Sequence, residues 1–152
     1  MNPTTIRPAV RDDLPGIIAL LADDVLGTSR EVVSDPLHPD YITAWDALER
    51  DPNQLVAVIE DPEGIAGCLQ ITVIPNLSHR GMFRGQIEGV RIAARRRGDG
   101  LGSQLLEWAV RYCKAQGCKM VQLTSDKARD DAVRFYEAHG FIASHEGMKR
   151  RL

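Results

Sequence analysis

The sequence predicts an α/β protein of the α+β type, with a mixed, mostly antiparallel sheet of about six or seven strands and helices on both faces. Short segments rich in Val and Ile alternate along the chain with segments whose apolar residues recur every three or four positions. Two of the short segments flank the turn "DPEG", which favours an antiparallel hairpin. Because 152 residues, 43% of them hydrophobic, are enough for one core, we expect a single domain over residues 1–152.

The first half of the chain predicts three strands and two helices. Two aspartates introduce the first helix, and its apolar residues fall on one stripe. A glycine and two prolines mark the loop that follows it. In order, the expected elements are a strand (4–10), a helix (12–26), a loop (27–40), a helix (41–50) and the two hairpin strands (54–60 and 65–74).

The second half continues the alternation. Its best-supported element is a long helix, because Leu101, Leu105 and Trp108 fall on one stripe and Gly117 can end the helix. A buried type of strand is expected after it, at "KMVQLTS". In order, the expected elements are a loop (75–82), a strand (83–93), a helix (100–117), a strand (119–125), a helix (130–140) and one or two terminal strands (within 141–152).

Composition argues against several classes of protein. A net charge of −2 and a pI near 6.1 do not fit a general nucleic-acid binder. No apolar segment approaches the roughly 18 residues of a membrane span, and the N-terminus lacks a signal-peptide pattern. The three cysteines and four histidines show no metal-ligand spacing, so we expect no metal site and a reduced, cytoplasmic compartment.

A basic, glycine-rich turn, "RRRGDGLGS", occupies residues 95–103 between an expected strand and an expected helix. The first N–H groups of a helix are unpaired and carry a partial positive charge. Glycines let a ligand approach them closely, and the arginines at 95–97 add full charges. These features are typical of a phosphate-binding turn. The turn lacks the P-loop ending and the dinucleotide spacing, and the alternative is a plain turn with a solvated basic flank.

Two motifs in this half resemble those of the GNAT acyltransferase superfamily. The first, Arg/Gln-x-x-Gly-x-Gly/Ala, matches Arg97, Gly100 and Gly102, and the second matches "AVRFYEAHGF" at residues 132–141. The segment "IEGVRIA" before the first motif is similar to the strand that splays from its neighbour in that family. The first strand and helix are similar as well, so the resemblance covers essentially the whole chain. It implies the GNAT fold with a splayed central strand pair.

The resemblance also implies a reaction, the direct transfer of an acetyl group from acetyl-CoA to an amine. Glu88 is the candidate base that deprotonates the amine, and Tyr136 is the candidate acid for the departing thiolate. By alternation, Glu88 is expected to share a face with Gln86 and Val90. A solvated strand glutamate and a buried helix tyrosine are the structural alternatives for these two residues.

The resemblance assigns the cofactor site to one strand end, the glycine turn and the start of the last helix. Many family members carry an asparagine three residues before the alanine of the second motif, where this chain has Arg129. That arginine could reach a phosphate of CoA or turn into solvent beside Asp130 and Asp131. The residues assigned to acetyl-CoA are Val90, Arg91, Ile92, Arg97, Gly98, Asp99, Gly100, Leu101, Gly102, Ser103 and Arg129.

The acceptor is expected to be a small-molecule primary amine. Residues 12–51 hold ten acidic and two basic side chains, a net charge of −8, which favours a cationic amine if this segment borders the acceptor. Tyr41 and Trp45 are candidates for the acceptor wall or for the core. A protein or peptide acceptor and a non-catalytic acyl-CoA-binding module are the alternatives. We expect neither nucleic acid nor a membrane as a partner, and a homodimer is left open.

Overall fold

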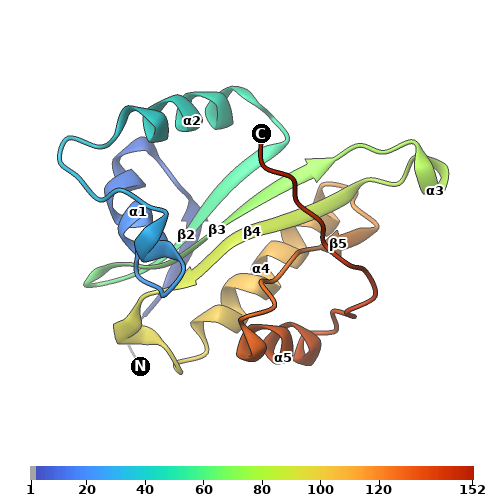
Figure 1. Ribbon diagram of the computed structural model, residues 1–152. Coiled ribbons are helices and arrows are strands. Elements are labelled where there is room, and N and C mark those ends of the chain that lie inside the picture. The colour runs from blue at the N-terminus through green and yellow to red at the C-terminus, as the bar shows by residue number, and fades with distance from the viewer. Residues whose placement is uncertain (1–2) are drawn as a thin grey trace.

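The computed structural model describes residues 3–152, which form a five-stranded sheet in the order β1-β2-β3-β4-β5 (Figure 1). Neighbouring strands are antiparallel except β4 and β5, which are parallel. The strands are β1 (Thr5–Pro8), β2 (Gln54–Asp61), β3 (Gly64–Ile74), β4 (Arg84–Ile92) and β5 (Met120–Gln122). The helices are α1 (Leu14–Ala22), α2 (Pro39–Arg50), the short α3 (Ser78–Gly81), α4 (Leu101–Ala115) and α5 (Asp130–Ala138).

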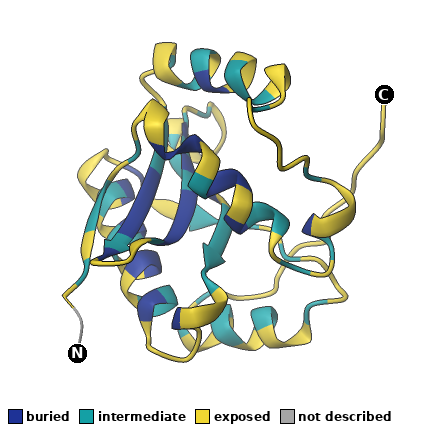
Figure 2. Cartoon of the chain, turned by 90° about the vertical axis from the view of Figure 1, so that its left-hand side faces the viewer, coloured by how far each residue is buried: buried dark blue, intermediate teal, exposed yellow. Residues whose placement is uncertain are grey.

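Helices cover both faces of the sheet, as the sequence predicts. Figure 1 shows α1 and α2 above the sheet and α4 and α5 below it. The main core lies between the sheet and α4, where Ile71, Ile87 and Leu105 are almost fully buried. A smaller apolar cluster lies beneath α1 and includes Ile17 and Val58. Figure 2 shows the buried residues gathered on the strands and on the helix sides that face them.

The expected strands within residues 141–152 are wrong. This segment has no strand, and every residue from 142 to 152 is exposed. The expected strand at 119–125 is present only as Met120–Gln122, and it is an edge strand whose Met120 is 43% exposed. The second difference follows from the first, because without a terminal strand beside it β5 has a single neighbour among residues 3–152.

A bulge in β4 changes which side chains share a face. The register between β3 and β4 shifts between Cys68 and Gln70, opposite Gly89, whose φ is 63°. Before the shift, Ile87 faces α4 and Glu88 faces α1. After it, Val90 packs on the α4 side, and Arg91 pairs with Cys68 on the α1 side. The expected common face of Glu88 and Val90 is therefore wrong, because the bulge interrupts the alternation.

Strands β4 and β5 separate after a short contact. They pair only from Arg84 to Gln86 and from Met120 to Gln122, whereas β4 continues to Ile92. Beyond Gln86, the edge of β4 that faces β5 has no strand partner in residues 3–152. This is the splayed strand pair that the sequence resemblance implies.

Candidate active site

The opening between β4 and β5 begins at the candidate base. Glu88 is exposed on the α1 face and lies two residues beyond Gln86, the last residue of β4 that pairs with β5. Val90 and Ile92 lie farther along the opening, partly buried, with their side chains on the α4 side. Their backbone is what the opening offers to a ligand, since their side chains belong to the core.

A row of polar side chains crosses the α1 face of the sheet beside Glu88. Gln54, Thr72, Gln86 and Gln122 occupy matched positions on β2, β3, β4 and β5. The amide of Gln122 donates to Oε1 of Gln86 at 2.8 Å, and Oε1 of Gln54 accepts from the Thr72 hydroxyl at 2.9 Å. Gln70 pairs with Glu88 across the strands. A polar floor of this kind suits hydrogen bonding to a small polar ligand.

Arg84 lies on the same face as Gln86 and Glu88, at the start of β4. The intervening Gly85 marks the opposite face, because a side chain there would meet the Cys113 sulfur. Within residues 3–152 Arg84 has no ion-pair partner, and its Nε is buried without a hydrogen bond. A guanidinium left without a carboxylate can bind an anionic ligand.

The glycine turn leads into α4 in the geometry that phosphate binding needs. Gly98 and Gly100 have φ of 88° and 79°, and a Cβ added to either would meet no atom within 4 Å. The first helical hydrogen bond runs from Gln104 N to Gly100 O at 3.1 Å, which leaves the preceding N–H groups of the turn without helical acceptors. The Leu101 side chain is buried, so only its backbone is available. The residues present therefore fit a pyrophosphate at this helix start.

Two of the three arginines at 95–97 are already neutralised by carboxylates, which corrects the expectation that they add free charge. Asp61, whose side chain has no exposed surface, binds both Arg95 and Arg96. Hydrogen bonds from Arg95 in particular hold the pKa of the Asp61 carboxyl well below its usual range. Arg96 also binds Asp99 at 2.8 Å. These two arginines fix the turn to the end of β2.

Arg97, the arginine of the family motif, binds backbone carbonyl groups instead of Asp61. Its Nε donates to Ile92 O at 3.2 Å and its NH2 donates to Asp23 O at 3.0 Å. Ser103, at the end of the glycine turn, contacts His139 at 3.0 Å, which joins α4 to α5. Arg97, Asp99 and Ser103 therefore all lie around the turn, and their contribution to acetyl-CoA binding stays a prediction.

Asp24 joins three segments that are distant in the sequence. Its carboxylate lies 2.9 Å from Nε of Arg91 and 2.9 Å from NH2 of Arg129, and it accepts N–H bonds from Leu26 and Gly27. Burial raises the pKa of Asp24, but these hydrogen bonds and the two arginines together lower it by more, and the resulting pKa is about 2. Arg129 thus binds Asp24 rather than Asp130 or Asp131, and 31% of its side chain is exposed. We call Asp24, Arg91 and Arg129 the Asp24 cluster.

Tyr136 lies next to the Asp24 cluster. Its ring packs edge-on against Phe135 and Phe141, with ring centroids 5.2 and 5.8 Å away. Burial raises the pKa of its hydroxyl above the ordinary 10.0, while Arg91 and Arg129 act against that rise. The phenol is therefore protonated at neutral pH and able to donate a proton.

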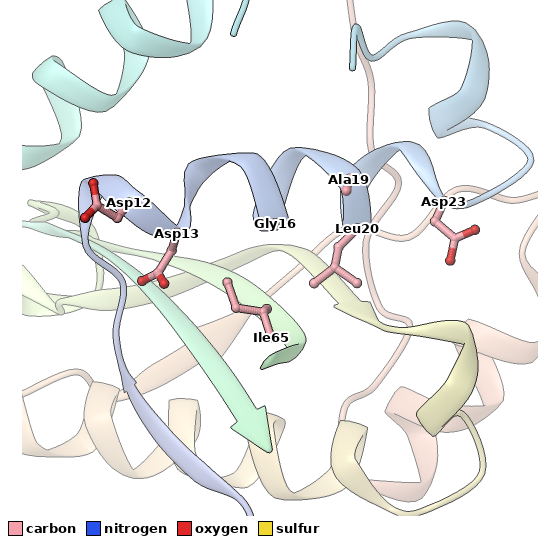
Figure 3. Close-up of a pocket in the computed structure, with 7 residues that line it drawn as sticks. All are labelled: Asp12, Asp13, Gly16, Ala19, Leu20, Asp23 and Ile65. Carbon is pink, nitrogen blue, oxygen red and sulfur yellow. The ribbon is translucent and has the colours of Figure 1, made fainter. Parts of the chain in front are cut away.

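The acidic segment 12–51 is partly neutralised by contacts. Asp24 binds two arginines, Asp23 lies 3.5 Å from Arg97, and Asp13 lies 2.7 Å from Arg7. An open depression of about 570 Å³ runs along α1 (Figure 3), bordered by Asp12, Asp13, Gly16, Ala19, Leu20, Asp23 and Ile65. It lies over the start of β3, apart from the polar row, and only its Asp23 end approaches the glycine turn.

Trp45 belongs to the core rather than to an open wall. It is 5% exposed, and among the described residues its Nε1 has no hydrogen-bond partner. Sequence reasoning missed Asp24, Asp61 and Arg84 as residues that shape this region. The excess of acid in residues 12–51 was a signal for Asp24, but its partners lie 67 and 105 residues away, so spacing could not identify them.

The fold and this opening are those of an acyltransferase. A sequence profile described as the acetyltransferase (GNAT) family matches residues 18–141. The chain belongs to that family and is an acetyl-transferring enzyme.

A relative in sequence supports this assignment, and two solved structures share the fold. An aminoalkylphosphonate N-acetyltransferase of Salmonella typhimurium is 34% identical over 143 residues, which cover 92% of this chain and 86% of that protein. A crystal structure from Bacillus halodurans, described as a transcriptional regulator, is 46% identical with a TM-score of 0.96, covering 99% of this chain and 100% of that one. A glucosamine-6-phosphate N-acetyltransferase from Arabidopsis thaliana shares the fold at 22% identity, with a TM-score of 0.79 and 98% of each chain covered. No helix within residues 3–152 is long and apolar enough to cross a membrane.

Proposed function

We propose that the protein transfers an acetyl group from acetyl-CoA to the primary amine of a small molecule, by direct attack. The observation that carries this proposal is the opening of the sheet after Gln86, which has a carboxylate at its start and a glycine-rich helix start at its far end. Acetyl-CoA with its pyrophosphate on residues 98–103 would place its thioester along the free edge of β4.

The reaction removes two protons from the ammonium nitrogen and delivers one to the leaving thiolate. Glu88 takes a proton from the ammonium group, and the free amine then attacks the thioester carbonyl. The C–N bond forms, a backbone N–H of β4 binds the oxyanion, and the C–S bond breaks. Tyr136 gives its proton to the leaving thiolate, and the second proton that the nitrogen loses restores the phenol. The products are the amide and CoA thiol, with one net proton released from the ammonium.

The positions of both residues support these roles. Glu88 is exposed at the start of the opening, and Tyr136 lies close enough to Arg91 for that charge to act on its pKa. Glu88 and Arg91 are three residues apart on β4, about 10 Å along a strand. These positions support a candidate base and a candidate acid that act along the same stretch of β4, as a direct transfer requires.

The acceptor that we propose carries an acid group as well as its amine. Ion pairs of Asp13, Asp23, Asp24 and Asp46 offset part of the charge that favoured a cationic acceptor. Within residues 3–152 Arg84 has no ion-pair partner, and it lies on the face that holds Glu88, about 13 Å away along the strand, a distance that two long side chains shorten. The Salmonella relative, by its name, acetylates aminoalkylphosphonates, which combine an amine with an anion.

A matched acceptor panel tests this proposal. Release of CoA thiol would be measured with an aminoalkylphosphonate, the amino alcohol of equal length and a diamine. We expect the highest kcat/KM for the phosphonate, and we expect Arg84→Met to raise its KM at least about 10-fold, in keeping with the loss of a charge-assisted hydrogen bond, while leaving the amino alcohol unchanged. Lys114→Met, at the end of α4, is the control. A preference for the diamine would reject the acid-bearing acceptor but leave the proposed acetyl transfer to a small-molecule amine in place.

The same assay addresses the alternatives. Release of CoA thiol only with peptides would indicate that the acceptor is a protein rather than a small molecule. Binding of acetyl-CoA by calorimetry, with no release for any amine or peptide, would identify a module that binds acyl-CoA without turnover.

A further inference from the structure

His139 joins the end of α5 to the start of α4, the two helices that lie below the sheet in Figure 1. Its Nδ1 lies 2.8 Å from Phe135 O, and its Nε2 lies 3.0 Å from Oγ of Ser103. The backbone N–H of His139 donates to Tyr136 O, so the imidazole is the partner of the Phe135 carbonyl. The Ser103 hydroxyl has no other hydrogen-bond partner within residues 3–152. The imidazole therefore links a backbone carbonyl to a hydroxyl of the glycine turn.

The carbonyl determines which ring nitrogen of His139 carries a hydrogen. A carbonyl oxygen only accepts hydrogen bonds, so Nδ1 is the donor in the contact with Phe135 O. In the neutral imidazole, Nε2 then has no hydrogen and accepts the hydroxyl hydrogen of Ser103. In the imidazolium, Nε2 donates instead, and the Ser103 hydroxyl can give its hydrogen to another acceptor. The protonation of His139 thus decides whether Ser103 can donate to a ligand.

The two helix ends act on the charge of His139 in opposite directions. The C-terminus of α5 carries a partial negative charge, which stabilises an imidazolium. The N-terminus of α4 carries a partial positive charge, which destabilises it. An anion bound at the start of α4 would cancel this positive charge and add a full negative charge close to Ser103. Anion binding at the turn therefore favours the protonated form of His139.

The arginines of the turn leave room for this additional cation. Arg95 and Arg96 are bound to Asp61, and Arg97 donates to backbone carbonyl groups. No carboxylate forms an ion pair with His139 in the part of the chain from 3 to 152. The other titratable side chains near it on the three adjoining segments are Glu107 and Arg111 on α4, Tyr136 and Glu137 on α5, and Arg97 and Asp99 in the turn. Among these residue types and histidine, histidine is the one that ordinarily changes charge between about pH 5 and pH 8.

We propose that His139 takes up a proton when acetyl-CoA binds, and that the imidazolium frees the Ser103 hydroxyl to donate to the pyrophosphate. One proton from solvent joins Nε2, and no covalent bond to the cofactor forms. His139 is a positioning residue, because it acts on the cofactor through Ser103. This inference rests on the proposed function, since it takes residues 98–103 as the pyrophosphate site.

Proton uptake on binding has a defined effect on affinity. A lower pH favours the state that holds the extra proton, so the affinity for acetyl-CoA should fall as pH rises. The phosphates of acetyl-CoA can exchange protons too, and this contribution is common to wild type and to a variant without the imidazole. The ratio of the two affinities therefore isolates the part that belongs to His139.

Calorimetry with acetyl-CoA at pH 6 and pH 8 measures this ratio. His139→Gln keeps a neutral donor of similar reach and removes the titrating ring. We expect wild type to bind about 10-fold more tightly than His139→Gln at pH 6 and within about 3-fold of it at pH 8, in keeping with one charge-assisted hydrogen bond. His145→Gln is the matched control and should follow wild type, because His145 also contacts a serine hydroxyl, that of Ser144 at 2.7 Å, but in the terminal segment.

The outcomes separate this inference from the proposed function. If wild type binds acetyl-CoA and the ratio is the same at both pH values, the role of His139 is overturned and the proposed function stays intact. If wild type binds no acetyl-CoA, the proposed function is overturned and this inference with it.

Ser103→Ala tests whether His139 acts through the hydroxyl. In the Ser103→Ala background, adding His139→Gln should change the affinity at pH 6 by less than about 3-fold, because the second link of the chain is already missing. A full 10-fold effect in that background would show that the imidazolium acts on the cofactor without Ser103, contrary to the proposal.

Nitrogen-15 NMR of the imidazole rings gives a measurement that does not depend on affinity. The chain has four histidines, and the signals lost in His139→Gln belong to His139. We expect the neutral ring to carry its hydrogen on Nδ1, and we expect acetyl-CoA to move both nitrogen signals toward those of the imidazolium. A neutral ring with its hydrogen on Nε2, or signals that acetyl-CoA leaves unchanged, would overturn the proposal.

Discussion

Tyr136 is the residue for which contacts and chemistry are easiest to separate. Its ring packs on Phe135 and Phe141, whereas its hydroxyl has no hydrogen-bond partner within residues 3–152. Tyr136→Phe keeps the packing and removes only the proton donor. We expect kcat to fall roughly 10- to 1,000-fold while acetyl-CoA affinity and the melting temperature stay the same. An unchanged kcat with chemistry still limiting would reduce Tyr136 to a packing residue.

The same tyrosine gives a prediction for pH. Its pKa is raised above 10.0, so the protonated form that serves as an acid persists beyond pH 10. The alkaline limb of the kcat profile that belongs to Tyr136 should therefore lie above pH 10 in the wild-type protein and be absent from Tyr136→Phe. A limb that stays in place in the variant would belong to another group.

Glu88 makes a complementary prediction. Glu88→Gln keeps the size and removes the base, and we expect kcat/KM to fall about 100-fold or more at pH 7. The deficit should shrink as pH rises, because the amine then loses its proton without help. Glu107→Gln, on the exposed side of α4, is the control and should behave as wild type. A pH-independent deficit would instead indicate that Glu88 positions the acceptor.

At the scale of elements, the start of α4 can be tested with a graded series at one glycine. A Cβ at Gly102 would lie 3.5 Å from Phe135 and 3.7 Å from Ile92, both ordinary contacts. Gly102→Ala should therefore bind acetyl-CoA within a few-fold of wild type. Gly102→Val adds two further methyl groups between α4, β4 and α5, which should displace the helix start that holds the pyrophosphate. We expect acetyl-CoA binding to weaken at least about 10-fold, or about 1.4 kcal/mol.

Calorimetry with acetyl-CoA, next to thermal unfolding of each variant, separates binding from stability. Wild-type affinity in a folded Gly102→Val protein would place the pyrophosphate elsewhere.

The order of elements was predictable from the sequence, and the details of pairing were not. Periodicity and turn residues placed α1, α2, α4, α5 and the first four strands. The Gly89 bulge depends on how β4 pairs with β3, which no local pattern reports, so the face of Val90 was assigned wrongly. The terminal strands were wrong for a related reason, because strand propensity in residues 141–152 does not reveal whether the segment pairs with a sheet edge.

The candidate site was predictable only as far as its motifs reach. The glycine turn and the Phe135–Tyr136 pair have local signatures, and the structure brings both to the opening beside β4. The environment of the arginines is non-local: Asp61 binds Arg95 and Arg96, and Asp24 binds Arg91 and Arg129. Three of those four looked like spare charge for a phosphate in the sequence, namely Arg95, Arg96 and Arg129.

At the scale of the whole molecule, Asp24 and Asp61 tie together segments that are far apart in the chain. Both carboxyl groups have pKa values below the usual range, that of Asp24 near 2. A lowered pKa stabilises the fold above the unfolded value of about 4, and this contribution is lost as pH falls toward the folded value. We therefore expect the free energy of unfolding to drop between about pH 4 and pH 2.

Urea unfolding of wild type and Asp24→Asn at pH 7 and pH 2.5 measures this contribution. The variant should be less stable by about 1–3 kcal/mol at pH 7, and the difference should shrink at pH 2.5. Asp46→Asn, at an exposed ion pair with Arg11, is the control and should change stability by less than about 1 kcal/mol. An equal deficit at both pH values would mean that packing, rather than charge, makes Asp24 stabilising.

The extra residue at Gly89 also determines where β4 can change in length. Deleting it would leave Val90 opposite Leu69 and Arg91 opposite Cys68, so both side chains would keep their present faces and the Asp24 cluster would keep its arginine. In a strand without an extra residue, the loss of one residue turns every later side chain to the other face. Among natural variants of this protein, length changes should therefore collect in the loops and, within β4, at the bulge.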